Sequence, residues 1–163
     1  MAHKIRLFDS GNDLSKYILF DSGLANYLLN GSDLLRTRIN DIHSGILYET
    51  VIGNEIISGL VSRDDLFYWK SDNVAEIDFL LRSPNLVGID VKKGRGDNKS
   101  LHSFALQEKE ALCLVKIYEG PFSLEKEYEA SLPTSPKRRR IPLLKTPHYL
   151  TSHLTGLLEE MSR

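Results

Sequence analysis

The sequence predicts an α/β protein with a mixed central sheet flanked by helices, and two observations lead to this fold class. First, three short runs rich in aromatic and branched residues follow one another between turn-forming residues, at 66–70, 74–82 and 86–93. Second, a stretch with helical spacing separates the last of these runs from a further apolar run at 111–118. A helix between two strands permits a parallel crossover, so the sheet is expected to be mixed.

We expect a single domain over residues 1–163, which is enough chain for a core of its own. The core is expected at about residues 44–119, between an N-terminal strand-helix extension (1–43) and a C-terminal extension (120–163). In the C-terminal extension, residues 120–140 are polar, interrupted by prolines and difficult to assign. A short apolar run, IPLL, follows them, and the last segment is expected to be helical.

In the N-terminal extension, the run SKYILF has the pattern of a short strand. Asp21 or Ser22 can cap a helix that follows it, because short polar side chains accept hydrogen bonds from the first amides of a helix. We expect this helix to end at Asn30 and Gly31, since both residue types tolerate the left-handed conformation of a helix end.

The core begins with a predicted helix over residues 44–62, and Glu49 lies at the centre of its apolar stripe. The positions that fall within about 60° of Glu49 on a helical projection are Ile46, Ile52, Gly53, Ile56 and Leu60. Glu49 is therefore expected to face the core. Glu55 falls roughly 120° away and is expected to be solvated.

The second half of the core consists of a helix and a strand. Ser100 can cap the helix, in which apolar residues recur at helical spacing up to residue 108. The run at 111–118 is then a buried strand, and its single cysteine, Cys113, is expected to act as a small buried hydrophobe.

Composition excludes several classes of protein. A formal net charge of −1, with 41% hydrophobic and 26% charged residues, is typical of a soluble globular protein rather than of a strongly basic nucleic-acid binder. No window approaches the roughly 18 apolar residues of a membrane helix, and MAHKIRLFDS lacks the apolar segment of a signal peptide. The expected location is therefore the cytoplasm.

Polar residues interrupt two of the predicted strands. Side chains alternate along a strand, so Ile77 and Phe79 are expected on one face and Asp78 on the other. In the next strand the same alternation places Asp90 and Lys92 side by side, about 6 to 7 Å apart along the chain. We expect the functional site on this face.

The order of elements and acidic residues resembles the PD-(D/E)XK nuclease superfamily, which has a restriction-endonuclease-like αβββαβ core. More narrowly, the chain resembles the C-terminal domain of unknown function of bacterial and archaeal AAA+-type ATPases. The segments that carry this resemblance, over about residues 16–145, are KYILFDSGLANYL, GILYETVIGNEI, LFYWKSDNVAEIDFLL, GIDVKKG followed by SLHSF, and RIPLL.

The chain departs from that family in several respects. No G-x-x-x-x-G-K-[ST] loop is present, and Gly94 and Gly96 do not form one, so an ATPase module would have to act in trans. The segment usual upstream of KYILFD is missing or abbreviated, as expected of a fragment or a reduced member. Residue 90 is Asp where Glu is common, which shortens the carboxylate by one methylene, and residue 93 is Lys where a small polar residue is frequent.

The resemblance implies a Mg²⁺-dependent or Mn²⁺-dependent nuclease that hydrolyses phosphodiesters of DNA or another nucleic acid. Asp78 and Asp90 would ligate the metal ion, with the backbone carbonyl of Val91 and, directly or through a water, Glu49. Lys92 would orient the attacking water or hold the negative charge that develops on the phosphate. The predicted catalytic set is therefore Glu49, Asp78, Asp90 and Lys92.

Basic residues after the Asp-x-Lys strand are candidates for contacts with phosphates. Lys93, Arg95 and Lys99 crowd the following loop and are expected to position nucleic acid. The run PKRRR at 136–140 is expected to be a solvated loop, although it too could contact phosphates.

Two simpler interpretations stay open. Asp78 and Lys92 can form an ordinary buried ion pair, with Glu49 accepting hydrogen bonds from backbone amides. The chain can then be a catalytically inactive module that binds nucleic acid or a protein, such as an ATPase in trans, or an adaptor without a nucleic-acid role. No membrane partner is expected, and a dimer is possible.

Overall fold

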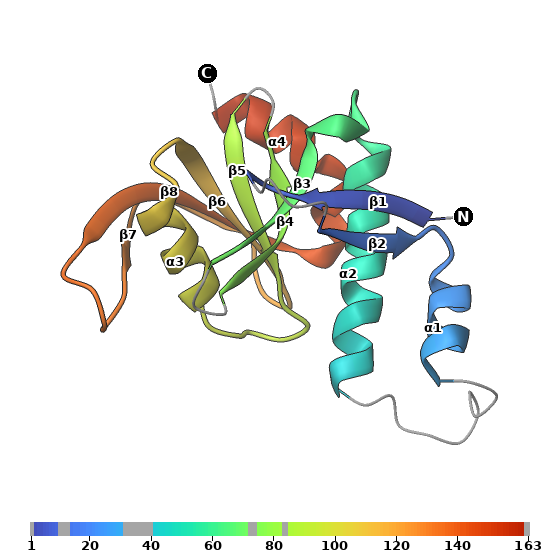
Figure 1. The fold of residues 1–163 in the computed structure, drawn as a ribbon. Helices are drawn as coiled ribbons and strands as arrows, with labels where there is room; N and C mark the ends of the chain where they lie inside the picture. Colours follow the sequence, from blue (N-terminus) through green and yellow to red (C-terminus); the bar gives the residue numbers. More distant parts are fainter. Residues whose placement is uncertain (1, 10–13, 31–40, 72–74, 83–84, 162–163) are drawn as a thin grey trace.

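The computed structural model describes residues 2–9, 14–30, 41–71, 75–82 and 85–161. In this part of the chain, eight strands form one mixed sheet that carries helices on both faces, which confirms the predicted α/β class (Figure 1). The strands are β1 (Ala2–Leu7), β2 (Ser15–Leu19), β3 (Leu66–Lys70), β4 (Glu76–Leu81), β5 (Leu86–Val91), β6 (Ala111–Tyr118), β7 (Ser123–Ser131) and β8 (Arg138–Pro147). The helices are α1 (Ser22–Asn30), α2 (Asp41–Ser58), α3 (Lys99–Gln107) and α4 (Leu154–Met161), with the 3₁₀ turns η1 (Arg63–Asp65) and η2 (His148–His153).

The sheet has the strand order β2-β1-β3-β4-β5-β6-β8-β7. β3, β4 and β5 form the antiparallel meander that the sequence predicts. β5 then pairs in parallel with β6 through the crossover of α3, and β6 pairs in parallel with β8. The core therefore follows the predicted order of helix, three strands, helix and strand, from α2 to β6.

Two apolar clusters, one on each face, hold the helices to the sheet. α2 and α4 pack Ile52, Ile56 and Leu154 onto one face. α3 packs Leu101 and Phe104 onto the other. The two central strands β5 and β6 are covered on both faces, which explains why their sequences are almost continuous apolar runs.

β2 and α1 form where the sequence predicts a strand and a helix, whereas β1 is a strand that the sequence does not predict. Asp21 caps α1 by accepting a hydrogen bond from the amide of Leu24 at 2.9 Å, whereas Gly31 lies outside the described residues. α2 extends from Asp41 to Ser58 instead of 44–62. Its apolar stripe is shorter than predicted, because Ile46 is 42% exposed. Asn98, and not Ser100, occupies the N-terminal cap of α3.

The segment 120–140, which the sequence leaves unassigned, forms β7 and the first part of β8. The run PKRRR therefore enters a strand, and the expectation of a solvated loop is wrong for its last residues. The guanidinium group of Arg139 donates hydrogen bonds to the carbonyl groups of Ala105, Glu108, Lys109 and Ala111. It thereby bonds carbonyls at the end of α3, in the following turn and at the start of β6. The carbonyls at a helix end have no partner within the helix.

We expect Arg139→Met to lower the free energy of unfolding by about 2–3 kcal/mol, because several carbonyl groups lose the hydrogen bond that the guanidinium donates. Arg138→Met is the matched control. Arg138 pairs with Glu129 at 2.6 Å on the surface, and its loss should change stability by no more than about 1 kcal/mol. Urea denaturation followed by circular dichroism measures both variants. Equal stability of the two variants would contradict this role of Arg139.

Within the described residues, no helix is both long enough and apolar enough to cross a membrane.

Candidate functional site

A β-bulge between β3 and β4 determines the position of Asp78, the acidic site residue of β4. The pairing of β3 with β4 shifts between Phe67 and Trp69, where Tyr68 stands opposite two residues of β4, Asp78 and Phe79. Such a bulge inserts one extra residue into a strand and changes the direction of its side chains.

The bulge overturns the simple alternation that the sequence predicts for this strand. Ile77 packs with Leu80 in the cluster under α3, whereas Phe79 and Leu81 pack in the cluster under α2. Ile77 and Phe79 therefore lie on opposite faces, not on the same one. Asp78, between them, is buried at the point where the strand changes face.

Asp78 is bonded directly to the Asp-x-Lys segment of β5. Its Oδ2 accepts a hydrogen bond from the amide of Val91 at 2.7 Å. Val91 is the residue between Asp90 and Lys92, so this bond holds the acid of β4 against the end of β5. The structure thus brings Asp78, Asp90 and Lys92, with the predicted carbonyl ligand Val91, together at one end of the central strands β4 and β5.

Asp90 and Lys92 form an ion pair, with 3.0 Å between Lys92 Nζ and Asp90 Oδ1. Asp90 is 1% exposed, and its second oxygen, Oδ2, has no hydrogen-bond partner among the described atoms. The stem of Lys92 packs against Gly96, whose backbone has a positive φ of 47°. A side chain at residue 96 would clash with Lys92, so this glycine lets the loop fold over the lysine.

Glu49 reaches the site from α2 but is also paired with a cation. Lys16 Nζ lies 3.3 Å from Glu49 Oε2 and 3.9 Å from an oxygen of Glu76. The same ammonium lies 5.1 Å from the centre of the Phe79 ring, next to the bulge. Glu49 is therefore half-buried and salt-bridged rather than fully inside the core.

A second lysine, Lys116, stands beside Asp90 in the register of β5 and β6. It is buried, and its ammonium donates to the carbonyl of Gly96 and to Oδ1 of Asn98, each at 2.9 Å. It thereby ties the loop after Lys92 to the sheet.

The charges of the site are only partly balanced. Burial, followed by the negative charges of Glu49 and Asp90, raises the pKa of Asp78 to about 8. Burial also raises the pKa of Asp90, although Lys92 opposes this shift. For Lys92, the effect of burial is outweighed by Asp90, which raises the pKa of the ammonium. Asp78 is thus expected to carry a proton at neutral pH.

The predicted phosphate-binding residues lie in the loop that follows Lys92 and at the start of α3. Lys93, Arg95 and Lys99 are all exposed. Lys99 pairs with Asp97 at 3.2 Å, on the surface. Lys93 follows Lys92 directly in the chain, which places the first of these cations next to the site.

The site therefore consists of a tight part and a looser part. Asp78, Val91, Asp90 and Lys92 are linked by direct bonds, whereas Glu49 acts on Asp78 through its charge. Across the described ranges of the chain, no group of three or more His, Cys, Asp and Glu side chains is arranged so that it could hold a metal ion.

Sequence reasoning missed Lys16, Lys116 and His148. Lys16 and Glu49 are 33 residues apart, so no local pattern links them. Lys116 is a lone charge within the apolar run 111–118, which is the one signal that could have drawn attention to it. His148 donates from Nε2 to the carbonyl of Lys92 at 3.1 Å, and its position in sequence gives no hint of this contact.

The fold and the site together define a mixed α/β domain in which carboxylates and a lysine meet at the ends of two adjacent central strands. Residues 44–134 match the family described as "Domain of unknown function (DUF4143)", and the chain belongs to this family. No curated protein and no solved structure gives a significant match.

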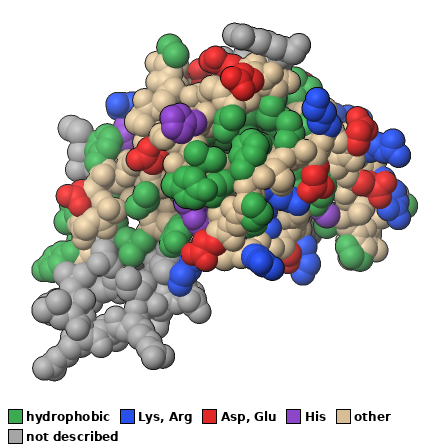
Figure 2. Space-filling model, turned by 180° about the vertical axis from the view of Figure 1, so that it is seen from behind, with side chains coloured by type: hydrophobic (Ala, Val, Ile, Leu, Met, Phe, Trp, Pro, Cys, Tyr) green, Lys and Arg blue, Asp and Glu red, His purple; other side chains and the backbone are tan. Residues whose placement is uncertain are grey.

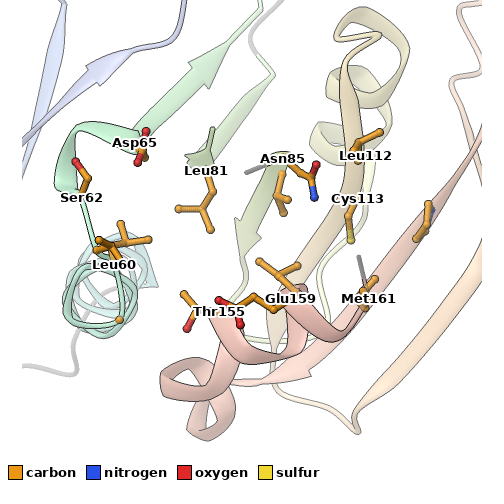
Figure 3. A pocket seen from close by; sticks show the side chains of 15 residues that line it. Leu60, Ser62, Asp65, Leu81, Asn85, Leu112, Cys113, Thr155, Glu159 and Met161 are labelled. Carbon is orange, nitrogen blue, oxygen red and sulfur yellow. The ribbon is translucent and has the colours of Figure 1, made fainter. Parts of the chain in front are cut away.

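A separate cavity of about 380 Å³ lies away from Asp78 and Asp90, between α4 and the ends of β4, β5 and β6 (Figure 3). Leu81 and Cys113 line it, from strand positions remote from Asp78 and Asp90. Cys113 is buried, as the sequence predicts, and burial raises the pKa of its thiol to about 11. The thiol is therefore expected to stay protonated at neutral pH, which suits packing rather than chemistry.

Proposed function

We propose that this DUF4143 domain is a metal-dependent, nuclease-like domain that hydrolyses phosphodiesters of DNA or another nucleic acid. The observation that carries the proposal is the bond between Asp78 Oδ2 and the amide of Val91. Because this bond joins an acid of one strand to an Asp-x-Lys segment of the next, it gives two carboxylates and an ammonium a common location. This arrangement also fits the resemblance to the PD-(D/E)XK superfamily.

Two features of the site suit a divalent cation such as Mg²⁺ or Mn²⁺. The Oδ2 atom of Asp90 is buried without a donor among the described atoms, and burial, together with the negative charges of Glu49 and Asp90, raises the pKa of Asp78. Mg²⁺ keeps several of its waters and needs only one or two carboxylates from the protein. Asp78 and Asp90 would hold the ion, together with the carbonyl of Val91, and Glu49 would act through its charge or through a water.

A bound cation would supply Lewis-acid activation of the phosphate and of the attacking water. The residues of the chain then have distinct tasks. Lys92, held beside Asp90, can stabilise the negative charge on the phosphate or orient the water. Lys93, Arg95 and Lys99 can contact phosphates on either side of the scissile bond.

The second candidate is a catalytically inactive module that binds nucleic acid or a protein. It is favoured by the fact that each acidic group already has a protein partner: Val91 for Asp78, Lys92 for Asp90 and Lys16 for Glu49. An ATPase supplied in trans, or a second copy of the chain, would then be the partner of this edge of the sheet.

Cleavage of a fluorogenic oligonucleotide in the presence of Mn²⁺ tests the first candidate. We expect Lys92→Ala to lower the rate roughly 100-fold or more, because one preorganised charge at the phosphate is lost. Lys109→Ala, an exposed lysine in the turn before β6, is the matched control and should retain the wild-type rate. Cleavage that is absent from the wild type, or equal in the wild type and Lys92→Ala, would refute hydrolysis at this site.

Isothermal titration with Mn²⁺ separates the two candidates without an activity assay. The first candidate requires Mn²⁺ binding that Asp90→Asn abolishes. Binding of nucleic acid by a protein that takes up no Mn²⁺ would instead support the inactive module.

A further inference from the structure

A groove with aromatic walls opens beside the acidic site, on the α2 side of the sheet. Its volume is about 610 Å³, within the range of pockets that enclose small organic groups. The residues that line it are Leu47, Tyr48, Val51, Ile52 and Glu55 of α2, and His148, Tyr149 and Ser152 of η2. Hydrophobic side chains gather in the middle of the face of the molecule shown in Figure 2, with charged side chains around them.

The groove is joined to the Asp-x-Lys segment by a direct contact. His148 Nε2 donates to the carbonyl oxygen of Lys92 at 3.1 Å, and the rings of His148 and Tyr48 lie 4.7 Å apart at 60°. Tyr48 is also the neighbour of Glu49 in α2. A group bound against these rings would therefore lie next to the backbone of Lys92.

The rings differ in how firmly they are held. The Tyr48 hydroxyl donates to Glu119 Oε1 at 3.2 Å, which fixes its ring as part of the wall. Tyr149 is 81% exposed, although it is a large aromatic residue in the short turn η2. A tyrosine ring this exposed offers a free face on which another flat ring can stack.

The charges around the groove suit a nucleotide that enters with its phosphate toward the acidic site. Lys93 is close enough to Tyr48 for its charge to act on that hydroxyl, so a cation stands at the end of the groove nearest Lys92. Glu55 lies at the groove as well, where a carboxylate can accept hydrogen bonds from the amino group of a base. The Glu119 carboxylate is occupied by Tyr48.

We infer that this groove binds an unpaired nucleobase, so that the substrate class of the domain is single-stranded nucleic acid. The inference deepens the proposed function, on which it rests. Bases in a duplex are stacked and paired, and their faces cannot reach Tyr149 without being extruded. A single strand presents its bases freely, and stacking on an aromatic side chain contributes to binding without regard to sequence.

Fluorescence anisotropy in EDTA tests the groove separately from cleavage. The probes are a labelled single-stranded oligodeoxynucleotide, its duplex, and an oligomer of the same length that lacks bases. We expect the single strand to bind most tightly, and Tyr149→Ala to weaken its binding roughly tenfold. Tyr27→Ala, an exposed tyrosine on α1, is the control and should bind as the wild type does.

A failure of nucleobase binding in the groove and a failure of hydrolysis would give different results. Single-strand binding that depends on Tyr149, in a protein without Mn²⁺-dependent cleavage, would support the groove and refute hydrolysis. Equal cleavage rates for single strand and duplex, with an unchanged rate in Tyr149→Ala, would support hydrolysis and refute nucleobase binding in the groove. Equal affinity for the oligomer without bases would also overturn it.

Discussion

Replacing Asp78 by asparagine is expected to stabilise the metal-free protein by on the order of 3–5 kcal/mol above pH 8 and to leave its stability almost unchanged near pH 4. Asparagine keeps an oxygen that can accept the hydrogen bond from Val91, and it removes the charge. The variant therefore isolates the effect of burying a carboxylate.

The sign follows from the raised pKa. An ordinary aspartate has a pKa of 3.8, whereas Asp78 in the folded protein has a pKa of about 8. Between these two values the folded state keeps a proton that the unfolded state has lost, so the stability of the wild type falls as the pH rises. Below this window both states are protonated, and above it both are ionised. The advantage of asparagine thus grows across the window and then levels off.

Urea denaturation of both proteins in EDTA, from pH 4 to pH 9, measures this difference. Asp64→Asn, at an exposed position on η1, is the control and should follow the wild-type curve. Curves for Asp78→Asn and the wild type that run parallel over the whole range would show that Asp78 does not titrate in the folded protein as proposed.

The second large effect is expected in the core under α3. Gly88 of β5 faces the ring of Phe104, and a Cβ atom at residue 88 would lie 2.5 Å from Phe104 Cε1. Phe104→Ala removes a fully buried ring and should lower the free energy of unfolding by about 3–5 kcal/mol. Gly88→Ala should cost about 1–3 kcal/mol, because the ring cannot move aside freely in a packed core.

A double-mutant cycle makes this prediction specific. In the double variant, the methyl group at residue 88 occupies part of the space that Phe104→Ala empties. The double variant should therefore lose less unfolding free energy than the sum of the losses in the two single variants. Phe122→Ala, whose ring is 47% exposed, should change stability little. Thermal or urea unfolding provides all four values, and strict additivity would argue against the contact between Gly88 and Phe104.

Local pattern was sufficient to predict much of the fold. β3 and β6 have the predicted boundaries, because each is a short apolar run between clear turn residues. β1 was missed, since Lys4 and Arg6 alternate with its apolar residues and weaken the signal. β7 and the first part of β8 are not predicted for a similar reason, because charged residues are frequent in both. Their pairing with each other, and that of β8 with β6, holds them in the sheet.

The candidate site was predictable in composition but not in geometry. The pairing of Asp90 with Lys92 follows from strand spacing alone. The bulge at Asp78 does not, because it depends on how β3 and β4 align across the sheet. Lys16 comes from β2, 33 residues away from Glu49, and no local pattern links the two. Lys116 stands out in the sequence only as a lone charge within the apolar run 111–118.

The bulge opposite Tyr68 also bears on how this family can tolerate changes in length. Deleting one residue of β4 near Phe79 would remove the bulge and restore a regular pleat, in which Ile77 and Leu80 keep the face that they share. The irregular backbone that holds Asp78 against the amide of Val91 would then be lost. An insertion there would misalign the acid with the amide of Val91 by a full residue. The spacing of β4 is therefore as much a requirement of this edge as the carboxylate itself, and homologues that keep the aspartate but differ in strand length should lack the same constellation.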